Sequence, residues 1–179
     1  MEKRIVPFTE SPAWPILAEL SDENVLWTGG LSSASPRLTA RAILKREDGL
    51  FAVMYAKKFN LYSLPGGGIE GDESPETAIA REIWEETGCT CSEIEPLGVV
   101  LENRFHADYT QIDYYFVVTA NGEAGQLHLT PNEEQNGTLP QWHTLDEVVH
   151  LIRDREHDTN QRKYLQARDV AALSAYLSR

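Results

Sequence analysis

Residues 67–89, GGIEGDESPETAIAREIWEETGC, form the most informative stretch of this chain, a loop followed by one helix with both ends marked. Ser74 suits the N-cap, and Pro75 suits the first helical position, where no amide donor is needed. Gly88 can adopt the left-handed conformation that ends a helix. One face of the segment carries the apolar residues Ile79, Ala80, Ile83 and Trp84. The spacing therefore predicts an amphipathic helix that packs on a core.

The other face of this helix carries three carboxylates. Glu82, Glu85 and Glu86 stand at i, i+3 and i+4, so they project from the same side. Like charges at this spacing destabilise a helix by about 0.2–0.5 kcal/mol per pair, and the last turns of a helix favour cations. A hard divalent cation such as Mg²⁺ would turn this repulsion into coordination. Three glutamates alone would equally suit a solvated acidic face, so the interpretation depends on their surroundings.

Two neighbouring features favour the metal site. Residues 64–68, LPGGG, form a loop whose backbone can approach a ligand closely, because glycine has no Cβ. Arg81 lies four residues before Glu85 and can also reach back toward Glu73. Such a contact would hold the loop and the helix together.

The pattern G-x5-E-x7-R-E-U-x-E-E-x-G-U, in which U is aliphatic, is that of the Nudix hydrolases, and this sequence resembles them closely. The matching residues are Gly67, Glu73, Arg81, Glu82, Ile83, Glu85, Glu86 and Gly88. Average residue usage gives a chance match on the order of 10⁻⁹ per window. Only Cys89 departs from the pattern, and a small, commonly buried residue there alters packing rather than chemistry.

The resemblance implies an α/β fold, a Nudix-type α/β/α sandwich with a mixed β-sheet. We expect residues 37–179 to form the Nudix domain. Residues 1–36, rich in Pro, Ser and Gly, are predicted to be an N-terminal extension that packs on it, with Trp14 and Trp27 as anchors.

The remaining elements follow from local patterns. Residues 38–45 and 50–56 predict a hairpin, because a turn signal joins them. Further strands are expected at 93–102, 111–120 and, briefly, 127–129, with polar loops at 103–110 and 130–138 and helices at 145–153 and 164–177. Thr144 opens the first of these helices with a capping-box pattern. His106, a lone histidine in the loop at 103–110, is more typical of a surface residue than of a base.

The resemblance assigns Glu82, Glu85 and Glu86 to metal binding and catalysis, with the carbonyl of Gly66 as a further ligand. The expected cofactor is Mg²⁺, with Mn²⁺ as an alternative. Bound metal would neutralise a diphosphate and lower the pKa of a bound water. Arg81 and Glu73 would be structural.

The resemblance does not single out one general base. In this family the base comes from the conserved motif itself or from a glutamate on a later loop. Glu133 and Glu134 are the candidates on such a loop, and we assign Glu134. Plain surface charges would explain both residues equally well.

The expected substrate-binding residues are Arg41, Phe59, Tyr62 and Gly67. In the resembling family, an aromatic residue near Phe59 and basic residues on neighbouring strands often line the substrate pocket. Core packing would also explain Phe59 and Tyr62, and a surface or structural role would also explain Arg37 and Arg41.

The implied reaction is hydrolysis of a nucleoside diphosphate linked to a group X, with water attacking phosphorus. A nucleoside triphosphate pyrophosphohydrolase is the first choice, and an ADP-ribose or nucleotide-sugar hydrolase is the second. Processing of RNA 5′ ends comes third. A nucleotide-binding regulator without catalysis would be signalled by loss of a metal-binding glutamate, and none is lost.

Composition limits the remaining possibilities. A chain of 179 residues with 41% hydrophobic residues fits one domain, and a net charge of −12 makes nucleic acid an unlikely non-specific partner. The sequence has no apolar run of 18 residues and no secretion leader, so we expect a cytoplasmic protein that does not enter membranes. Cys89 and Cys91 then stay reduced. Either a monomer or a homodimer fits the sequence.

Overall fold

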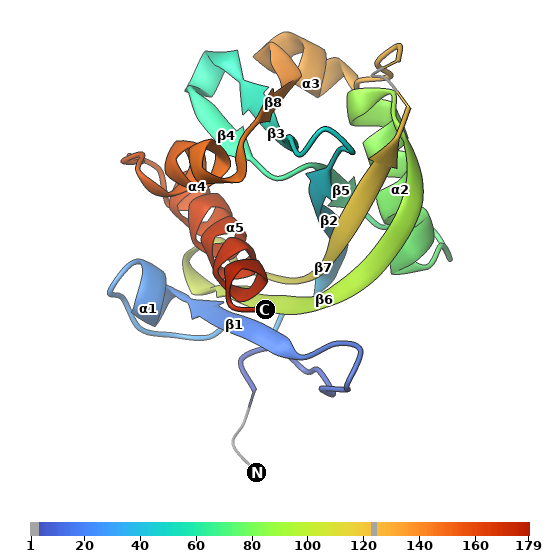
Figure 1. Cartoon of the computed structure of the whole chain (residues 1–179). Helices are drawn as coiled ribbons and strands as arrows, with labels where there is room; N and C mark the ends of the chain where they lie inside the picture. Colours follow the sequence, from blue (N-terminus) through green and yellow to red (C-terminus); the bar gives the residue numbers. More distant parts are fainter. Residues whose placement is uncertain (1–3, 123–124) are drawn as a thin grey trace.

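The computed structural model describes residues 4–122 and 125–179, which form a mixed β-sheet covered by helices on both faces (Figure 1). The strands are β1 (Ile16–Ser21), β2 (Arg37–Lys45), β3 (Phe51–Ala56), β4 (Leu61–Ser63), β5 (Gly66–Gly68), β6 (Thr90–Arg104), β7 (Tyr109–Asn121) and β8 (Thr138–His143). The α-helices are α1 (Asp22–Val25), α2 (Pro75–Thr87), α3 (Pro131–Asn136), α4 (Leu145–Arg153) and α5 (Asn160–Leu177). Two single-turn 3₁₀ helices are η1 (Lys57–Phe59) and η2 (Phe105–Ala107). The predicted α/β/α sandwich is confirmed.

The strand order is β1-β6-β7-β2-β3-β4, while β5 pairs with β2 and β8 pairs with β3. The β1–β6 and β2–β7 pairs are parallel, and the other pairs are antiparallel. The parallel β2–β7 pair joins strands far apart in the sequence and lies in the middle of the sheet. This pairing brings the start of β2, next to the glycines of β5, beside the start of β7.

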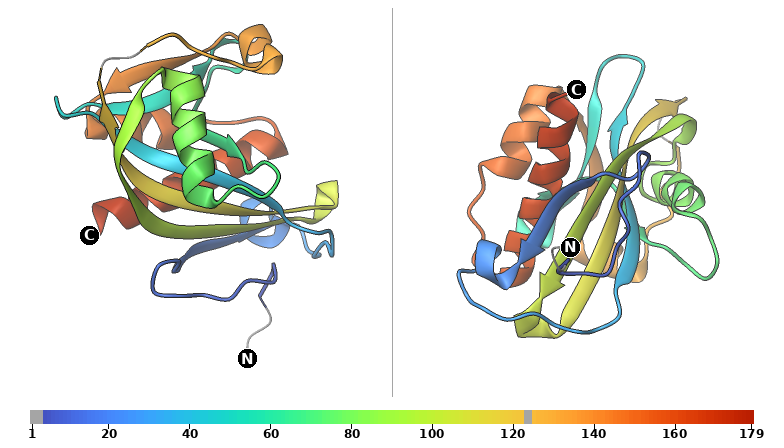
Figure 2. Two further views of the ribbon diagram at one scale, coloured as in Figure 1. Left: turned by 90° about the vertical axis from the view of Figure 1, so that its right-hand side faces the viewer. Right: turned by 90° about the horizontal axis from the view of Figure 1, so that it is seen from below.

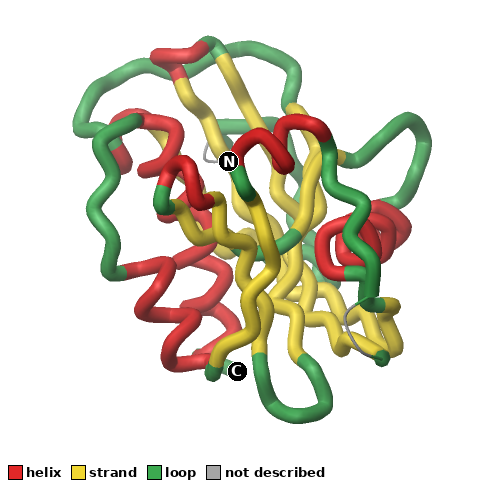
Figure 3. Tube along the Cα trace, turned by 90° about the horizontal axis from the view of Figure 1, so that it is seen from above, coloured by secondary structure: helices red, strands yellow, loops and turns green. Residues whose placement is uncertain are grey.

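Two apolar cores form because successive side chains of a strand point to opposite faces of the sheet. Ala42 of β2 packs in the same cluster as Ile79 and Ile83 of α2. Ile43, the next residue, belongs to the cluster under α4 and α5 together with Val148. Helix α2 therefore covers one face and the α4–α5 pair covers the other (Figures 2 and 3).

Helix α2 has the predicted ends. Ser74 accepts a hydrogen bond from the Thr77 amide at 3.2 Å, and Gly88 is left-handed with a φ of 70°. The predicted apolar stripe is partly wrong. Ala78, rather than Ala80, is fully buried, and Trp84 is 45% exposed. Buried glutamates take up part of the inward face, so Trp84 is left on the outer side, where it stacks on His128.

The N-terminal segment adds strand β1 to the sheet edge beside β6. Trp14 packs edge-on against Tyr114 and Phe116, with ring centroids 4.8 and 5.1 Å away. The anchoring role predicted for Trp14 is confirmed. The same prediction for Trp27 is wrong, because its side chain is 89% exposed.

Most local predictions agree with the structure. The hairpin of β2 and β3 is present, α4 spans the predicted residues, and β6 and β7 are longer than expected. Helix α5 begins earlier than expected, at Asn160, because Thr159 caps it. No described helix is long and apolar enough to span a lipid bilayer.

Two predictions between β7 and β8 are wrong. Residues 127–129 form no strand, and the expected loop at 130–138 contains α3 and the start of β8. Thr130 caps α3 and Glu133 completes a capping box, while Pro131 occupies the first turn. These are the signals that predicted α4 correctly, so α3 could have been found from the sequence.

Candidate active site

The acidic face of α2 lies against the glycines of β5. The Gly66 amide donates a hydrogen bond to Oε2 of Glu86 at 2.8 Å. A Cβ atom on Gly67 would lie 2.5 Å from Oε1 of Glu82. Glu82 and Glu86 are 9% and 5% exposed, so the solvated acidic face is excluded for these two carboxylates.

Gly66 is the position in this strand that only glycine can fill. Its φ is +134°, and a Cβ atom there would lie 2.2 Å from the carbonyl oxygen of Ala40. The strand can therefore pass close to β2 and still leave its amide for Glu86. The carbonyl of Gly66 accepts a hydrogen bond from Nη1 of Arg41 at 3.2 Å.

Arg81 holds the loop and the carboxylates in place. Its Nη2 donates to Oε1 of Glu73 at 2.6 Å and to the carbonyl of Gly68 at 2.9 Å. Its Nη1 donates to Oε1 of Glu82 at 2.9 Å and to Oε2 of Glu85 at 3.2 Å. One guanidinium thus bridges the loop before α2 to two of the three carboxylates, as the sequence predicted for Arg81 and Glu73.

The site holds an excess of negative charge. Burial, together with the charge of Glu82, raises the pKa of Glu86 well above its ordinary value. Burial also raises the pKa of Glu82, although Arg81 opposes this effect. The charge of Glu133 adds to the repulsion at both residues. A bound cation would relieve this repulsion.

Within the described residues, no three acidic, histidine or cysteine side chains converge into a ready metal cage. Arg81 donates hydrogen bonds to oxygens of both Glu82 and Glu85. The residues nevertheless fit a hard divalent cation, because buried carboxylates and a backbone carbonyl are the ligands that such ions prefer.

The two candidates for the general base lie differently. Glu133 is half-buried, and its charge acts on Glu82 and Glu86. Its side chain accepts hydrogen bonds from the amide and hydroxyl of Thr130, at 2.7 and 2.8 Å. Glu134 is exposed on α3. Of the two, the structure brings Glu133 toward the carboxylates of α2, whereas Glu134, the assigned candidate, faces solvent.

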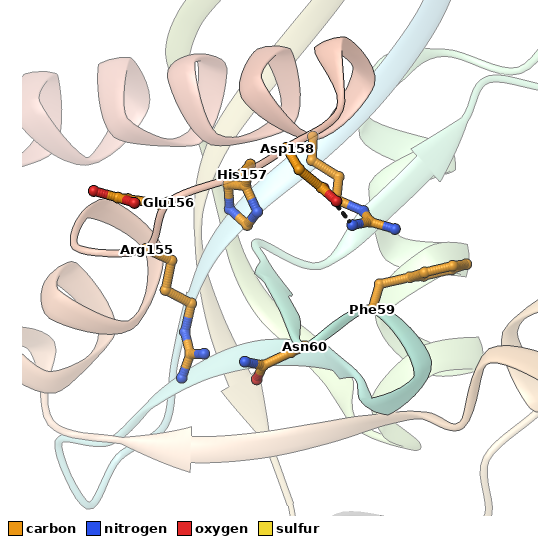
Figure 4. Close-up of a pocket in the computed structure, with 7 residues that line it drawn as sticks. Phe59, Asn60, Arg155, Glu156, His157 and Asp158 are labelled. Atoms are coloured by element: carbon orange, nitrogen blue, oxygen red, sulfur yellow. Dashed lines mark hydrogen bonds and ion pairs between the residues drawn. The ribbon is translucent and has the colours of Figure 1, made fainter.

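Phe59 and Tyr62, two of the predicted substrate residues, lie near the segment before α5. Phe59 lines a cavity of about 360 Å³ with Arg155, His157 and others (Figure 4). Tyr62 stacks on Tyr55 with ring centroids 4.5 Å apart, and the guanidinium of Arg155 lies 4.5 Å from the Tyr62 ring centroid. Both residues are partly exposed, and Tyr62 also packs against the core under α4 and α5.

The other two predicted substrate-binding residues, Arg41 and Gly67, lie on the paired strands β2 and β5, and their roles differ. Gly67 supplies the space that Glu82 needs. Arg41 is 9% exposed and pairs with buried Asp113 at 3.1 Å. Arg41 also lines a second cavity, of about 410 Å³, between the sheet and α5.

Of the residues that line this second cavity, the sequence predicted only Arg41 as a substrate contact. The others include Arg37, Arg104, His106 and Arg168. His106 is exposed, as the sequence predicted, and its Nδ1 lies 2.9 Å from Oδ1 of buried Asp22. These residues come from the start of β2, the end of β6, η2 and α5, so no local pattern links them.

Comparison with known proteins supports the motif and the fold. A family model described as NUDIX domain matches residues 35–167. A MutT-like protein of Streptomyces ambofaciens is 33% identical over 111 residues, 62% of this chain and 66% of that protein. Diphosphoinositol polyphosphate phosphohydrolase 3-alpha of Mus musculus is 35% identical over 109 residues, 61% of this chain and 63% of that protein. The chain therefore spans just under two thirds of the length of these relatives.

Among solved structures, a NUDIX hydrolase from Nitrosomonas europaea superposes with a TM-score of 0.58, covering 80% of this chain and 90% of that one. At 18% identity, this likeness shows the fold alone. The names of the relatives refer to different substrates.

Proposed function

This chain belongs to the NUDIX family, and from that premise we propose that it is a metal-dependent pyrophosphohydrolase acting on a nucleoside diphosphate linked to a further group. The observation that carries the proposal is the burial of two glutamates of α2, Glu82 and Glu86, against the glycines of β5. Buried like charges are costly unless a ligand compensates them.

We propose that Glu82, Glu85, Glu86 and the carbonyl of Gly66 hold the metal, Mg²⁺ or alternatively Mn²⁺. When bound, the metal would neutralise the diphosphate and lower the pKa of the attacking water. Arg81 would move away from Glu82 and Glu85 while it keeps its contacts to Glu73. The site would then hold a diphosphate beside the backbone of β5.

For the general base, the position of Glu133 near the carboxylates of α2 makes it the stronger candidate, and Glu134 is the alternative. A carboxylate there would accept the proton of water as it attacks phosphorus. Separate Glu133→Gln and Glu134→Gln variants distinguish them, because only loss of the base would lower kcat without weakening substrate binding.

The proposed substrate is a nucleoside triphosphate, cleaved to the monophosphate and pyrophosphate. The test is a product screen with Mg²⁺ that compares common and oxidised nucleoside triphosphates, ADP-ribose, nucleotide sugars and dinucleoside polyphosphates. Glu86→Gln is the inactive control. Glu76→Gln is the matched control, because Glu76 is exposed in the first turn of the same helix.

Pyrophosphate release from a triphosphate by the wild type and Glu76→Gln, but not by Glu86→Gln, would support the proposal. Cleavage confined to ADP-ribose or a nucleotide sugar would mean that this compound, and not a triphosphate, is the substrate. Full activity in Glu86→Gln would contradict the assignment of metal ligands. Nucleotide binding without any hydrolysis would favour a regulator.

For the whole chain, we propose a cytoplasmic protein, monomeric or homodimeric, in which residues 1–36 extend the domain formed by 37–179. Cys89 and Cys91 are both free thiols, which suits a reducing compartment. Size-exclusion chromatography with light scattering would determine the oligomeric state.

A further inference from the structure

The cavity between the sheet and α5 is lined by four arginines, Arg37, Arg41, Arg104 and Arg168. Among the described residues, no carboxylate lines it. Its volume of about 410 Å³ falls in the range of small-molecule sites. In a chain with a net charge of −12, this concentration of cations in one cavity suits a ligand of opposite charge.

The buried arginines are held in place from behind the cavity wall. Arg168 is 3% exposed and has Asp113 and Glu102 at 3.6 and 3.8 Å. Its Nε makes no hydrogen bond to any described residue and lies 3.6 Å from Oδ1 of Asp169. Arg104 donates to Oε2 of Glu102 at 2.7 Å. Burial, with the charge of Asp113, raises the pKa of Glu102 to about 8. A protonated Glu102 would leave the cavity wall more positive.

Arg37 differs from the other three arginines because its side chain is exposed at the start of β2. It makes no ion pair with any residue in the described part of the chain. A Cβ atom on Gly68 would lie 3.0 Å from Nη2 of Arg37. Arg37 thus lies at the edge of the cavity, beside β5, with no ion-pair partner in the described part of the chain.

Strand β5 separates the cavity from the carboxylates of α2. Gly67 contacts Glu82 on the α2 side, whereas Gly68 lies beside Arg37. The carbonyl of Gly66 accepts from Arg41, which lines the cavity, and its amide donates to Glu86. A substrate crossing this narrow strand would meet the carboxylates and the arginines at once.

The N-terminal segment contacts two residues next to or at this cavity, Tyr164 and His106. Asp22 is 1% exposed and accepts a hydrogen bond from the hydroxyl of Tyr164 at 2.7 Å. It also accepts from the His106 amide at 2.7 Å, and this contact fixes η2 at the rim. Asp22 lies outside the residues matched by the family model.

We propose that this cavity binds a phosphate group of the substrate other than the phosphate attacked at α2, with Arg37 as a direct contact. The inference rests on the proposed function and restricts it to substrates that carry an additional anionic group, such as the terminal phosphate of a triphosphate. A neutral sugar beyond the diphosphate would leave Arg37 without a partner.

The test measures binding rather than turnover. Inorganic triphosphate is titrated calorimetrically into the full chain in EDTA, so that metal binding at α2 does not contribute. We expect Arg37→Ala to bind at least about tenfold more weakly than the wild type, since a charge-assisted hydrogen bond to phosphate is lost. Arg37→Lys should recover part of the affinity. Arg153→Ala, which removes an exposed arginine of α4, should bind like the wild type.

Equal affinity in Arg37→Ala and the wild type, or no binding by the wild type, would overturn the proposal. Glu86→Gln separates this inference from the proposed function, because it should lose hydrolysis and keep triphosphate binding. Hydrolysis of a nucleotide with an unchanged KM in Arg37→Ala would refute the cavity assignment alone. Arginine-dependent binding without any hydrolysis would refute the proposed function alone.

Discussion

Replacing Arg81 with Ala should lower stability, because one guanidinium connects the loop before α2 to the helix. The variant loses hydrogen bonds to Glu73, Glu82, Glu85 and the carbonyl of Gly68. Arg81 is 23% exposed, and Glu82 is the most buried of these three carboxylates, at 11% side-chain exposure. Breaking a buried ion pair costs about 3–5 kcal/mol, and partial exposure places this one near 3 kcal/mol.

In a domain of this size, 1 kcal/mol shifts Tm by about 2–4 °C, so the expected loss is roughly 6–12 °C. The assay is thermal unfolding followed by circular dichroism in EDTA. Arg153→Ala is the control, because Arg153 and its partner Asp154 are both about half exposed. Removal of this exposed pair should leave Tm close to that of the wild type, because solvent screens the two charges.

A second measurement on Arg81→Ala, the change of Tm on addition of Mg²⁺, tests the role of the metal. Without Arg81, Glu82 and Glu85 repel each other unless a cation compensates them. Added Mg²⁺ should therefore raise Tm more in Arg81→Ala than in the wild type, because ligands that bind the folded state stabilise it. A Tm for Arg81→Ala within about 1 °C of the wild type would refute the structural role of this arginine.

Three further predictions concern single residues of the site. Glu86→Gln should be more stable than the wild type at neutral pH by about 0.5 kcal/mol in urea unfolding, because like-charge repulsion is relieved. Gly66→Ala should fail to fold, whereas Gly67→Ala should fold and lose activity by displacing Glu82, as comparison of circular dichroism and turnover would show. The pKa of Glu102 is raised to about 8 in the folded state. The folded protein therefore keeps this proton to a higher pH than the unfolded chain does, and stability should fall as pH rises from about 4.5 to about 8. This fall should be smaller in Glu102→Gln, and an unchanged pH profile would contradict it.

Local signals in the sequence were sufficient for α2, α4 and the contact between Arg81 and Glu73. Caps, helix periodicity and a spacing of a few residues act over short distances, so the chain carries them wherever it folds. The same kind of signal is present at Thr130, but we predicted a loop there where the structure has α3. The error at Trp84 has another origin. Helix periodicity alone does not determine which apolar residues of α2 face the core, because the buried Glu82 and Glu86 occupy part of the same face.

By itself, then, the sequence determined the family, the sandwich and the glutamates of α2, because these depend on a contiguous motif. The burial of Glu86 and the arginine cavity were decided by tertiary structure alone. Parallel pairing of β1 with β6 and of β2 with β7 joins segments that are distant along the chain. Asp22 reaches His106, and Arg37 comes near Arg168, only through those pairings and the packing of α5. No short-range pattern encodes such contacts, since their residues share neither a helix turn nor a strand.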